Sequence, residues 1–270
     1  MRQITSADNP HFRALLKLHQ SSRERRKAGL SLLDGAHLIS AYLDHVGAPE
    51  EVIVSRSGLE EGEIAVLLER PGVPQAMMLS DALFRQLSSV ATPTGIIGAV
   101  KTPAARPIPD TPAACVMLED LQDPGNLGSI LRSAAAAGVE EVYLSRTTVH
   151  AWSPRVLRAG MGAHFVVRIF EGVDLAALAC RFPGKVYAAA HDASLPLYSA
   201  DLRGRVALVF GNEGAGITRA LREAAHATLA IPMPGKAESL NVAAAAAVCL
   251  FERVRQISAV AGAVAGRQSR

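Results

Sequence analysis

The chain has 270 residues, a formal net charge of +3, and a composition that is 49% hydrophobic, 20% charged and only 4% aromatic. This composition excludes a disordered chain and indicates a compact core built mainly from Ala, Leu and Val, in a chain long enough for two domains. The mild positive charge permits a nucleic-acid partner without establishing one, because the effect of charge depends on where it lies.

The first hundred residues alternate between helix-like and strand-like segments. The segment NPHFRALLKLHQ, residues 9–20, spaces its apolar side chains near the helical period, and the strongly basic segment SSRERRKAG follows it. The alternation predicts a small α/β domain over residues 1–98. The expected strands are 30–33, 52–55 and 77–79, and the expected further helices are 36–45, 60–69 and 81–89.

Residues 99–114 hold four prolines among small residues and are predicted to form a linker. The alternation then resumes and predicts a second α/β domain over residues 115–258, followed by a flexible tail over 259–270. The expected strands are 115–118, 141–144, 166–170, 185–190, 206–210 and 228–231, and the expected helices are 127–137, 153–160, 218–225 and 240–256.

The cysteines and the apolar segments limit the class of protein. Cys115, Cys180 and Cys249 are far apart and lack the spacing of a zinc site, so we expect reduced core thiols and no metal ion. The polar N-terminal segment does not resemble a signal peptide, and the longest apolar run, 242–251, is about half of the ~20 residues that a membrane helix requires. We therefore expect a cytoplasmic protein with no membrane partner.

The first loop of chemical interest follows the strand at 115–118 and reads LEDLQDPGNLGSILRSAAAAG. Asn126 stands where an N-cap is expected, and Arg132 lies on the second helical turn, away from the apolar face. An arginine in that position is either a solvated helix charge or a guanidinium that binds phosphate.

The second loop, in VALVFGNEGAGIT, joins a buried strand to a helix through a glycine-rich turn, where open α/β sheets bind their ligands. Gly211, Gly214 and Gly216 have the spacing G-x-x-G-x-G, which is neither the dinucleotide fingerprint nor a P-loop. Glu213 is either a functional carboxylate or one that is favoured near a helix N-terminus.

The third loop reads IPMPGKAESLNVAAAAAVCLFE, and its prolines and glycine predict irregular backbone before a helix. Ser239 is either an ordinary N-cap or a functional hydroxyl, and Asn241 in the first turn has no obvious structural purpose. The five alanines that follow allow a backbone, a cofactor or a second subunit to approach this helix closely.

Together, N-x-G-x-x-x-R, G-N-E-G-x-G and I-P-M-x-G-x-x-x-S-L-N-V closely resemble the three signature motifs of the SpoU, or TrmH-like, branch of the SPOUT methyltransferases. They occur in the order of that family, across residues 115–256. The first hundred residues also resemble the substrate-binding domain often joined to this catalytic domain, which is similar to a kink-turn-binding fold. In this chain Asp34-Gly35 stands where a Glu-Gly pair is common in that domain.

The resemblance implies a parallel sheet with a C-terminal trefoil knot, a homodimer, and methyl transfer from S-adenosylmethionine to a ribose 2'-hydroxyl in RNA. It implies that the cofactor is held through Gly211, Ile231 and Leu240, with Met233 beside the adenine. The catalytic residues that it implies are Arg132, Asn126, Glu213, Ser239 and Asn241. Arg132 would act on the cofactor of the facing subunit.

Two roles for Arg132 are open. The reacting hydroxyl must be held in line with the methyl group and must lose a proton, and the arginine at this position in the family has been proposed as the base. Because a guanidinium stays protonated at ordinary pH, we favour a phosphate clamp and electrostatic stabiliser, with the base role as a hypothesis.

The identity of the RNA is the least determined point. The basic residues Arg23, Arg25, Arg26 and Lys27 are predicted to contact the phosphate backbone, the alternative being a solvated helix face. The N-terminal domain favours ribosomal RNA over transfer RNA. Two other classes remain: a catalytically silent RNA-binding or ribosome-assembly protein, and a dinucleotide oxidoreductase, which the glycine spacing disfavours.

Overall fold

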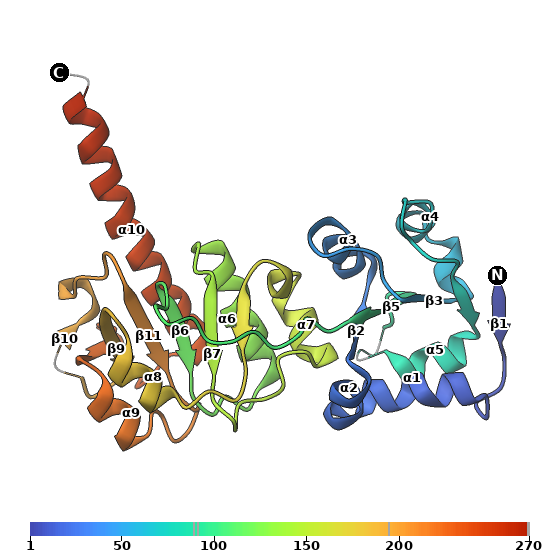
Figure 1. Ribbon diagram of the computed structural model, residues 1–270, viewed down its shortest axis with the longest axis horizontal. Helices are drawn as coiled ribbons and strands as arrows, with labels where there is room; N and C mark the ends of the chain where they lie inside the picture. Colours follow the sequence, from blue (N-terminus) through green and yellow to red (C-terminus); the bar gives the residue numbers. More distant parts are fainter. Residues whose placement is uncertain (89, 91, 194, 269–270) are drawn as a thin grey trace. The chain divides into compact units, whose positions relative to one another are not determined.

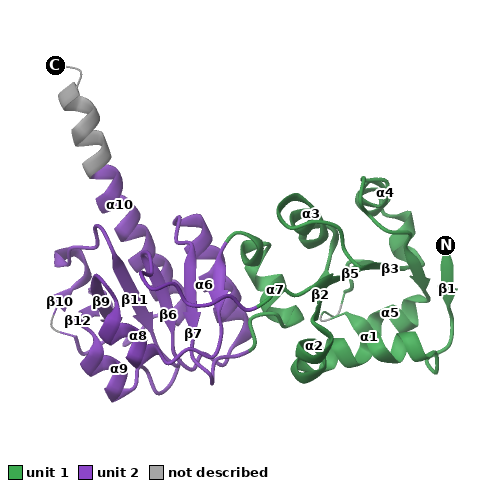
Figure 2. Ribbon diagram, viewed as in Figure 1, with its two compact units in different colours: residues 1–104, 150–166 green, residues 105–149, 167–270 purple. Residues whose placement is uncertain are grey.

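The computed structural model describes residues 1–88, 90, 92–193 and 195–268, which divide into two compact units (Figures 1 and 2). Unit 1 comprises residues 1–104 and 150–166, and unit 2 comprises residues 105–149 and 167–270. The segment 150–166 therefore groups with the N-terminal residues, although the sequence pattern had placed it in the second domain. Of the flexible tail predicted over 259–270, residues 259–268 are helical and residues 269–270 lie outside the described residues.

Unit 1 contains a five-stranded sheet with the order β1-β4-β3-β5-β2, in which β5 runs antiparallel to its neighbours. Sequence patterns missed β1, a three-residue strand, and β5, whose first five residues are all buried and so show no alternation. The strands are β1 (Arg2–Ile4), β2 (Leu30–Asp34), β3 (Glu51–Ser55), β4 (Met77–Leu79) and β5 (Ile96–Lys101).

The helices of unit 1 cover this sheet, and the first of them begins where the sequence predicts. The Asn9 side chain accepts hydrogen bonds from the backbone of His11 and Phe12, which caps that helix. Phe12 and Leu15 then bury themselves against Leu32 and Ile53. The helices are α1 (Pro10–Gln20), α2 (Ser22–Ala28), α3 (Ala36–His45), α4 (Gly62–Leu68), α5 (Asp81–Leu87) and α7 (Pro154–Gly160), with short 3-10 helices at Ser57–Glu60 and Ala163–Phe165.

Unit 2 contains a seven-stranded parallel sheet with the order β10-β12-β9-β11-β6-β7-β8. The central strands are continuous apolar runs, as is typical of parallel strands that are covered on both faces. The strands are β6 (Cys115–Leu118), β7 (Glu141–Leu144), β8 (Arg168–Phe170), β9 (Lys185–Ala189), β10 (Leu195–Pro196), β11 (Val206–Phe210) and β12 (Ala227–Ala230).

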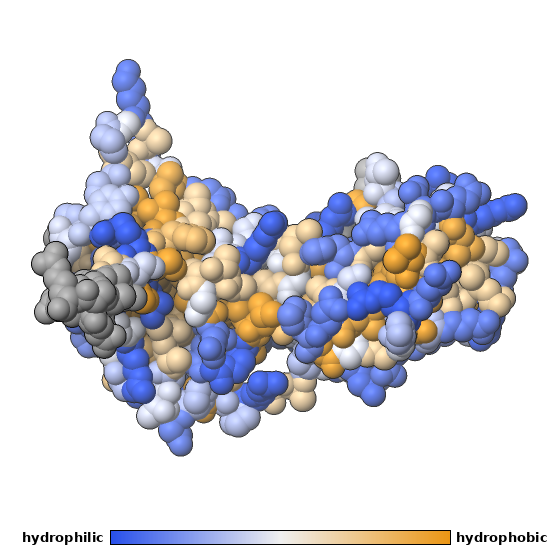
Figure 3. All heavy atoms as spheres, turned by 90° about the horizontal axis from the view of Figure 1, so that it is seen from above, coloured by the Kyte–Doolittle hydropathy of each residue, from blue (hydrophilic) through white to orange (hydrophobic). Residues whose placement is uncertain are grey.

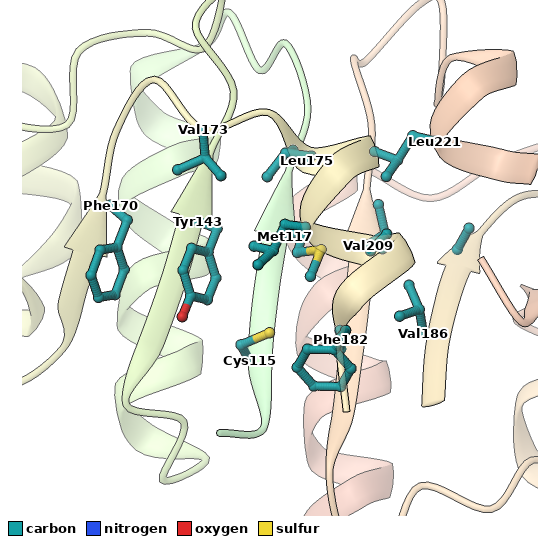
Figure 4. Packing of buried hydrophobic residues seen from close by; sticks show 14 residues of the cluster. Cys115, Met117, Tyr143, Phe170, Val173, Leu175, Phe182, Val186, Val209 and Leu221 are labelled. Atoms are coloured by element: carbon teal, nitrogen blue, oxygen red, sulfur yellow. The ribbon is translucent and has the colours of Figure 1, made fainter. Parts of the chain in front are cut away.

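Two pairs of helices pack in unit 2: α6 against α10, and α8 against α9. On the side of α8, Leu175 and Phe182 join a cluster with Met117 and Val209, and Tyr143 stacks on Phe170 with ring centroids 4.7 Å apart (Figure 4). Sequence patterns missed α8, whose residues LAALACR show little polar periodicity. The helices are α6 (Pro124–Ala136), α8 (Leu175–Arg181), α9 (Arg219–Ala224) and α10 (Val242–Gln268), with a 3-10 helix at Leu197–Ser199.

All three cysteines are free thiols, but the expectation that all lie in the core is wrong for Cys180, which is exposed. Burial raises the pKa of Cys249 to about 12, so this thiol stays protonated at neutral pH. Across the described residues, no group of three or more His, Cys, Asp or Glu side chains is arranged to hold a metal ion. No helix in that part of the chain has the length and apolar character needed to span a membrane.

Candidate functional site

A pocket of about 440 Å³ in unit 2 lies where the loops after β9, β11 and β12 meet. These strands are neighbours in the order β12-β9-β11, so their carboxyl ends lie at one edge of the sheet. The four residues predicted to hold a cofactor, Gly211, Ile231, Met233 and Leu240, all line this pocket. Three of the predicted catalytic residues, Glu213, Ser239 and Asn241, line it as well.

The glycine turn after β11 brings bare backbone to the pocket. A β carbon on Gly211 would lie 2.2 Å from the carbonyl oxygen of Gly216, so no side chain fits there. The backbone N–H groups of Asn212 and Gly216 each donate to the other's carbonyl over 2.9 Å, which closes the turn. Gly216 has a φ of +71°, which favours glycine. The glycine spacing thus serves this turn rather than a dinucleotide fingerprint.

One chain of hydrogen bonds connects residues from all three sequence motifs. The Asn126 Nδ2 donates to Glu213 Oε1 over 3.0 Å, and the Asn241 Nδ2 donates to Asn126 Oδ1 over 2.9 Å. The backbone N–H groups of Gln122 and Asp123 also donate to the Glu213 carboxylate, each over 3.3 Å. Residues more than a hundred positions apart are therefore fixed relative to one another beside the pocket.

The surroundings of Glu213 favour its charged form. Partial burial acts to raise the pKa of this carboxyl, but the hydrogen bonds from Asn126 and from the backbone of Gln122 and Asp123 outweigh it. The net result is a pKa below the ordinary value. Glu213 is therefore a carboxylate at neutral pH, suited to accept hydrogen bonds and not to donate a proton.

Two capping assignments made from the sequence are wrong. Asp123, and not Asn126, caps α6, because its Oδ1 accepts the backbone N–H of Asn126 over 2.7 Å. Helix α10 begins at Val242, and the Asn241 side chain caps it by accepting the backbone N–H of Ala243 over 2.9 Å. Ser239 lies too early in the chain for that function, and it is exposed where it lines the pocket.

Arg132 stands apart from this arrangement. Its side chain is exposed on α6, six residues after Asn126, which corresponds to about 9 Å along a helix axis. It does not line the pocket, and it forms no ion pair within the described part of the chain. A single chain therefore brings together Asn126, Glu213, Asn241 and Ser239 but leaves Arg132 outside.

Sequence reasoning missed Asn212, which joins two of the motif loops. Its Oδ1 accepts the backbone N–H groups of Gly214 and Ala215, each over 2.9 Å, and its Nδ2 donates to the Asp120 carbonyl over 2.8 Å. Asp120 has a φ of +53°, in the left-handed region that non-glycine residues seldom adopt. The available signal was an asparagine at the start of a tight glycine turn, where such residues hydrogen-bond to nearby backbone.

The sequence analysis also did not predict that the loop after β9 contributes to the pocket, because this loop contains no recognisable motif. Residues 190–192 of this loop line the pocket, together with Ala188 and Ala189 at the end of β9. Asp192 there accepts a hydrogen bond from Arg222 of α9 over 2.7 Å, and Arg222 lines the pocket too. The pocket therefore has a charged pair in its lining in addition to the motif residues.

In unit 1, the basic segment divides into one buried and three exposed cations. Arg25 is only 5% exposed and donates from Nη1 to the carbonyls of Leu18, over 2.6 Å, and His19, over 3.1 Å. These hydrogen bonds join α2 to the end of α1. The prediction that the Arg25 guanidinium contacts the RNA backbone is therefore not supported, because the side chain is buried. Arg23, Arg26 and Lys27 are exposed.

Two family models match this chain. The model described as the SpoU rRNA Methylase family matches residues 113–251, and the model described as the MRM3-like substrate binding domain matches residues 9–98. A relative named 23S rRNA (guanosine(2553)-2'-O)-methyltransferase, from Bacillus subtilis strain 168, is 34% identical over 254 residues, which cover 93% of this chain and 98% of the relative.

Solved structures resemble the whole chain. A crystal structure described as an RNA 2'-O ribose methyltransferase matches with a TM-score of 0.80 and 32% identity, over 94% of this chain and 98% of that one. The SpoU methyltransferase AviRb from Streptomyces viridochromogenes, solved in complex with AdoMet, matches with a TM-score of 0.81 and 25% identity, over 92% of this chain and 98% of its own.

Proposed function

Since the chain belongs to the SpoU rRNA methylase family, we propose that it transfers a methyl group from S-adenosylmethionine to a ribose 2'-hydroxyl of ribosomal RNA. The family resemblance inferred from the three motifs is confirmed. The observation that carries the proposal is the hydrogen-bonded set of Asn126, Glu213 and Asn241 beside the pocket that Gly211 and Leu240 line.

The pocket fits the cofactor of this reaction. Gly211 leaves no room for a side chain, so its backbone lines the pocket directly, and Ile231, Met233 and Leu240 offer apolar surface suited to an adenine ring. When bound, S-adenosylmethionine supplies an electrophilic methyl group on sulfur. The four residues predicted from the family resemblance are the ones we propose to hold it.

The polar set positions the substrate. Because Glu213, Asn126 and Asn241 hold one another, their remaining donors and acceptors keep fixed directions and need no reorganisation during the reaction. The exposed Ser239 hydroxyl faces the same pocket and is available to the ribose or its phosphate. Most of the rate enhancement should come from holding the hydroxyl in line with the methyl group.

We place Arg132 in the facing subunit of a homodimer, where it clamps a substrate phosphate. Its distance from the pocket of its own chain supports this arrangement. Exposed apolar side chains also support a dimer: Phe251 and Ile257 of α10 are 50% and 38% exposed, and the face drawn in Figure 3 carries apolar residues among hydrophilic ones. The trefoil knot implied by the resemblance stays a prediction.

Mixing two inactive variants tests the facing-subunit arrangement. Arg132→Ala and Glu213→Ala chains, each inactive alone, would form mixed dimers in which one of the two sites is intact. We expect recovery of about a quarter of wild-type activity, because half of the dimers are mixed and half of their sites are complete. No recovery in demonstrably mixed dimers would mean that Arg132 acts within its own subunit.

The function itself is tested by transfer of labelled methyl groups to unmodified ribosomal RNA and, separately, to transfer RNA, followed by mapping of alkali-resistant ribose positions. We expect label at one 2'-oxygen of ribosomal RNA. Label in transfer RNA alone would overturn the choice of substrate. Absence of both transfer and cofactor binding would favour a silent RNA-binding protein. Action on ribosomal RNA also implies a cytoplasmic site of action. In this proposal residues 1–98 bind the RNA and residues 115–258 carry the catalytic site.

A further inference from the structure

The exposed cations of α2 are not balanced by nearby acids. The helix carries Arg23, Arg25, Arg26 and Lys27 against a single acidic residue, Glu24. Arg25 turns inward, where its Nη1 donates to two carbonyls at the end of α1 and its buried Nε has no hydrogen-bond partner among the described residues. Its charge still adds to the positive field of the helix, while the other three cations remain exposed and enter no ion pair within the described residues.

A second helix from a distant part of the chain adds to this field. Helix α7 lies in the segment 150–166, within the part that matches the methylase family, yet it packs against β2 in unit 1, as α2 does. Arg155 is exposed, whereas the buried residues of α7 are Pro154, Val156, Leu157 and Gly160. Arg155 also enters no ion pair among the residues that the structure describes.

Cations of these two helices affect the pKa values of His19, in α1, and His150, which precedes α7. Burial lowers the pKa of His19, and Arg25 and Arg155 lower it further, against the opposing effect of Asp34. Burial lowers the pKa of His150 to about 4, with Arg26 and Arg25 as further causes. Cations of α2 and α7 therefore act on the same small region of unit 1.

We propose that Arg23, Arg26 and Lys27 of α2 and Arg155 of α7 form one surface of unit 1, the α2–α7 surface, that binds phosphate groups of the substrate RNA. The proposal rests on the proposed function for the identity of the polyanion. A row of cations without carboxylate partners can exchange its counterions for phosphates without first breaking ion pairs. Arginine is favoured in such a position because its planar guanidinium donates two parallel hydrogen bonds to a phosphate.

The surface would explain why the segment 150–166 leaves the unit to which its sequence neighbours belong. Arg155 comes from the part of the sequence that matches the methylase family, whereas the other three cations come from the N-terminal part. The α2–α7 surface therefore combines residues from both parts. Sequence inspection counts Arg155 as an isolated charge, because the nearest members of the surface are more than a hundred positions away.

The test measures binding of unmodified ribosomal RNA, transcribed in vitro, to the full-length chain as a function of KCl concentration. Three variants are compared: Arg155→Gln, the triple change Arg23→Gln, Arg26→Gln and Lys27→Gln, and all four together. Each lost phosphate contact should reduce the slope of log affinity against log salt by about 0.7 to 0.9. The fourfold variant should bind more than about tenfold more weakly at low salt.

Matched controls are Arg13→Gln and Arg70→Gln, which remove an exposed and a partly buried arginine of unit 1 that pair with Asp8 and Asp44. They should leave the slope unchanged. All variants should bind S-adenosylhomocysteine as tightly as wild type, and in the methyl-transfer assay the KM for RNA should rise while kcat is retained.

An unchanged slope for Arg155→Gln, with a reduced slope for the α2 triple variant, would overturn the two-helix surface. Unchanged slopes for both would overturn it entirely, even if methyl transfer to ribosomal RNA is observed. Failure of methyl transfer in wild type, with the predicted slopes intact, would instead count against the proposed function alone.

Discussion

The pocket of unit 2 and the α2–α7 surface of unit 1 both present polar side chains to solvent. They differ in whether those side chains bind to one another. At the pocket, Asn126, Glu213 and Asn241 hold one another, and Asn212 in the glycine turn hydrogen-bonds to Asp120 in the loop before α6. On the α2–α7 surface, Arg23, Arg26, Lys27 and Arg155 have no ion-pair partner among the described residues.

The difference reflects two physical tasks. Catalysis requires groups whose directions are fixed before the substrate arrives, because reorganisation during the reaction costs free energy. Binding a flexible polyanion requires charges that are free to find phosphates, and their effect depends on number and placement more than on direction. Substitutions at the pocket should therefore change kcat sharply, while substitutions on the surface should change RNA affinity gradually and in a salt-dependent way.

The largest effect is expected for Glu213→Ala. The change leaves the Asn126 amide and the N–H groups of Gln122 and Asp123 without their acceptor, so that the positions of all three motifs relax. We expect the single-turnover rate to fall by about 100-fold or more. Glu223→Ala, which removes only an exposed partner of Arg219, is the control and should retain wild-type activity. A loss below about threefold would show that the fixed set is not needed for catalysis.

Gly211→Ala should abolish most cofactor binding. The added carbon would lie 2.2 Å from the Gly216 carbonyl oxygen, so the turn must open and its backbone must leave the pocket. We expect the dissociation constant for S-adenosylhomocysteine, measured by calorimetry, to rise by more than about tenfold. Gly62→Ala is the matched control, since a carbon added there meets nothing within 4 Å. Wild-type affinity in the Gly211 variant would contradict the proposed backbone contact.

Asn212→Asp should lower kcat by about tenfold. The new carboxylate keeps the acceptor for Gly214 and Ala215 but loses the donor to Asp120, and it sets a second negative charge beside the Asp120 carboxylate, which lies 3.4 Å from Asn212 Nδ2. Cofactor affinity should change less than kcat. Adding Asp120→Asn to this variant should restore part of the rate, because it removes the repulsion. If the double variant is no faster, the effect is not due to contact between these two side chains.

The smallest expected effect is on the pH dependence of the free energy of unfolding. It arises from His164, which lies in the segment 150–166 of unit 1. Burial lowers the pKa of His164 to about 4, and its Nε2 hydrogen bond with the Ala151 carbonyl opposes this only in part. Between pH 6.5 and 4 the unfolded chain binds a proton that the folded chain does not, so the free energy of unfolding should decrease as the pH falls. The loss from this residue between pH 7 and pH 5.5 should be about 1 kcal/mol.

Chemical denaturation at several pH values, monitored in wild type and in His164→Gln, measures this effect. The variant retains a donor for the Ala151 carbonyl but does not titrate, so its stability should depend less on pH. Equal pH dependence in the two proteins would mean that His164 is not buried in its neutral form. Methyl transfer by the variant at pH 7.5 should be unchanged.

The sequence by itself determined the elements that have a strong local signal. The strands 115–118, 141–144 and 206–210 and the helix 36–45 were predicted with their observed bounds, because continuous apolar runs and helical spacing are properties of a short segment. The pocket residues had another source: Gly211, Ile231, Met233 and Leu240 were implied by the family resemblance of the motifs. They line one pocket because loops that follow parallel strands meet at one edge of a sheet.

Only the tertiary structure decided what depends on which segments meet. The strand order β12-β9-β11-β6 is not the chain order, so no local pattern shows that Asn241 reaches Asn126 or that Asn212 reaches Asp120. Arg25 is buried because its guanidinium donates to carbonyls at the end of α1. Arg155 is grouped with the cations of α2 because α7 and α2 both pack on β2. Periodicity determines which face of an element is buried, whereas packing between distant elements determines what that face touches.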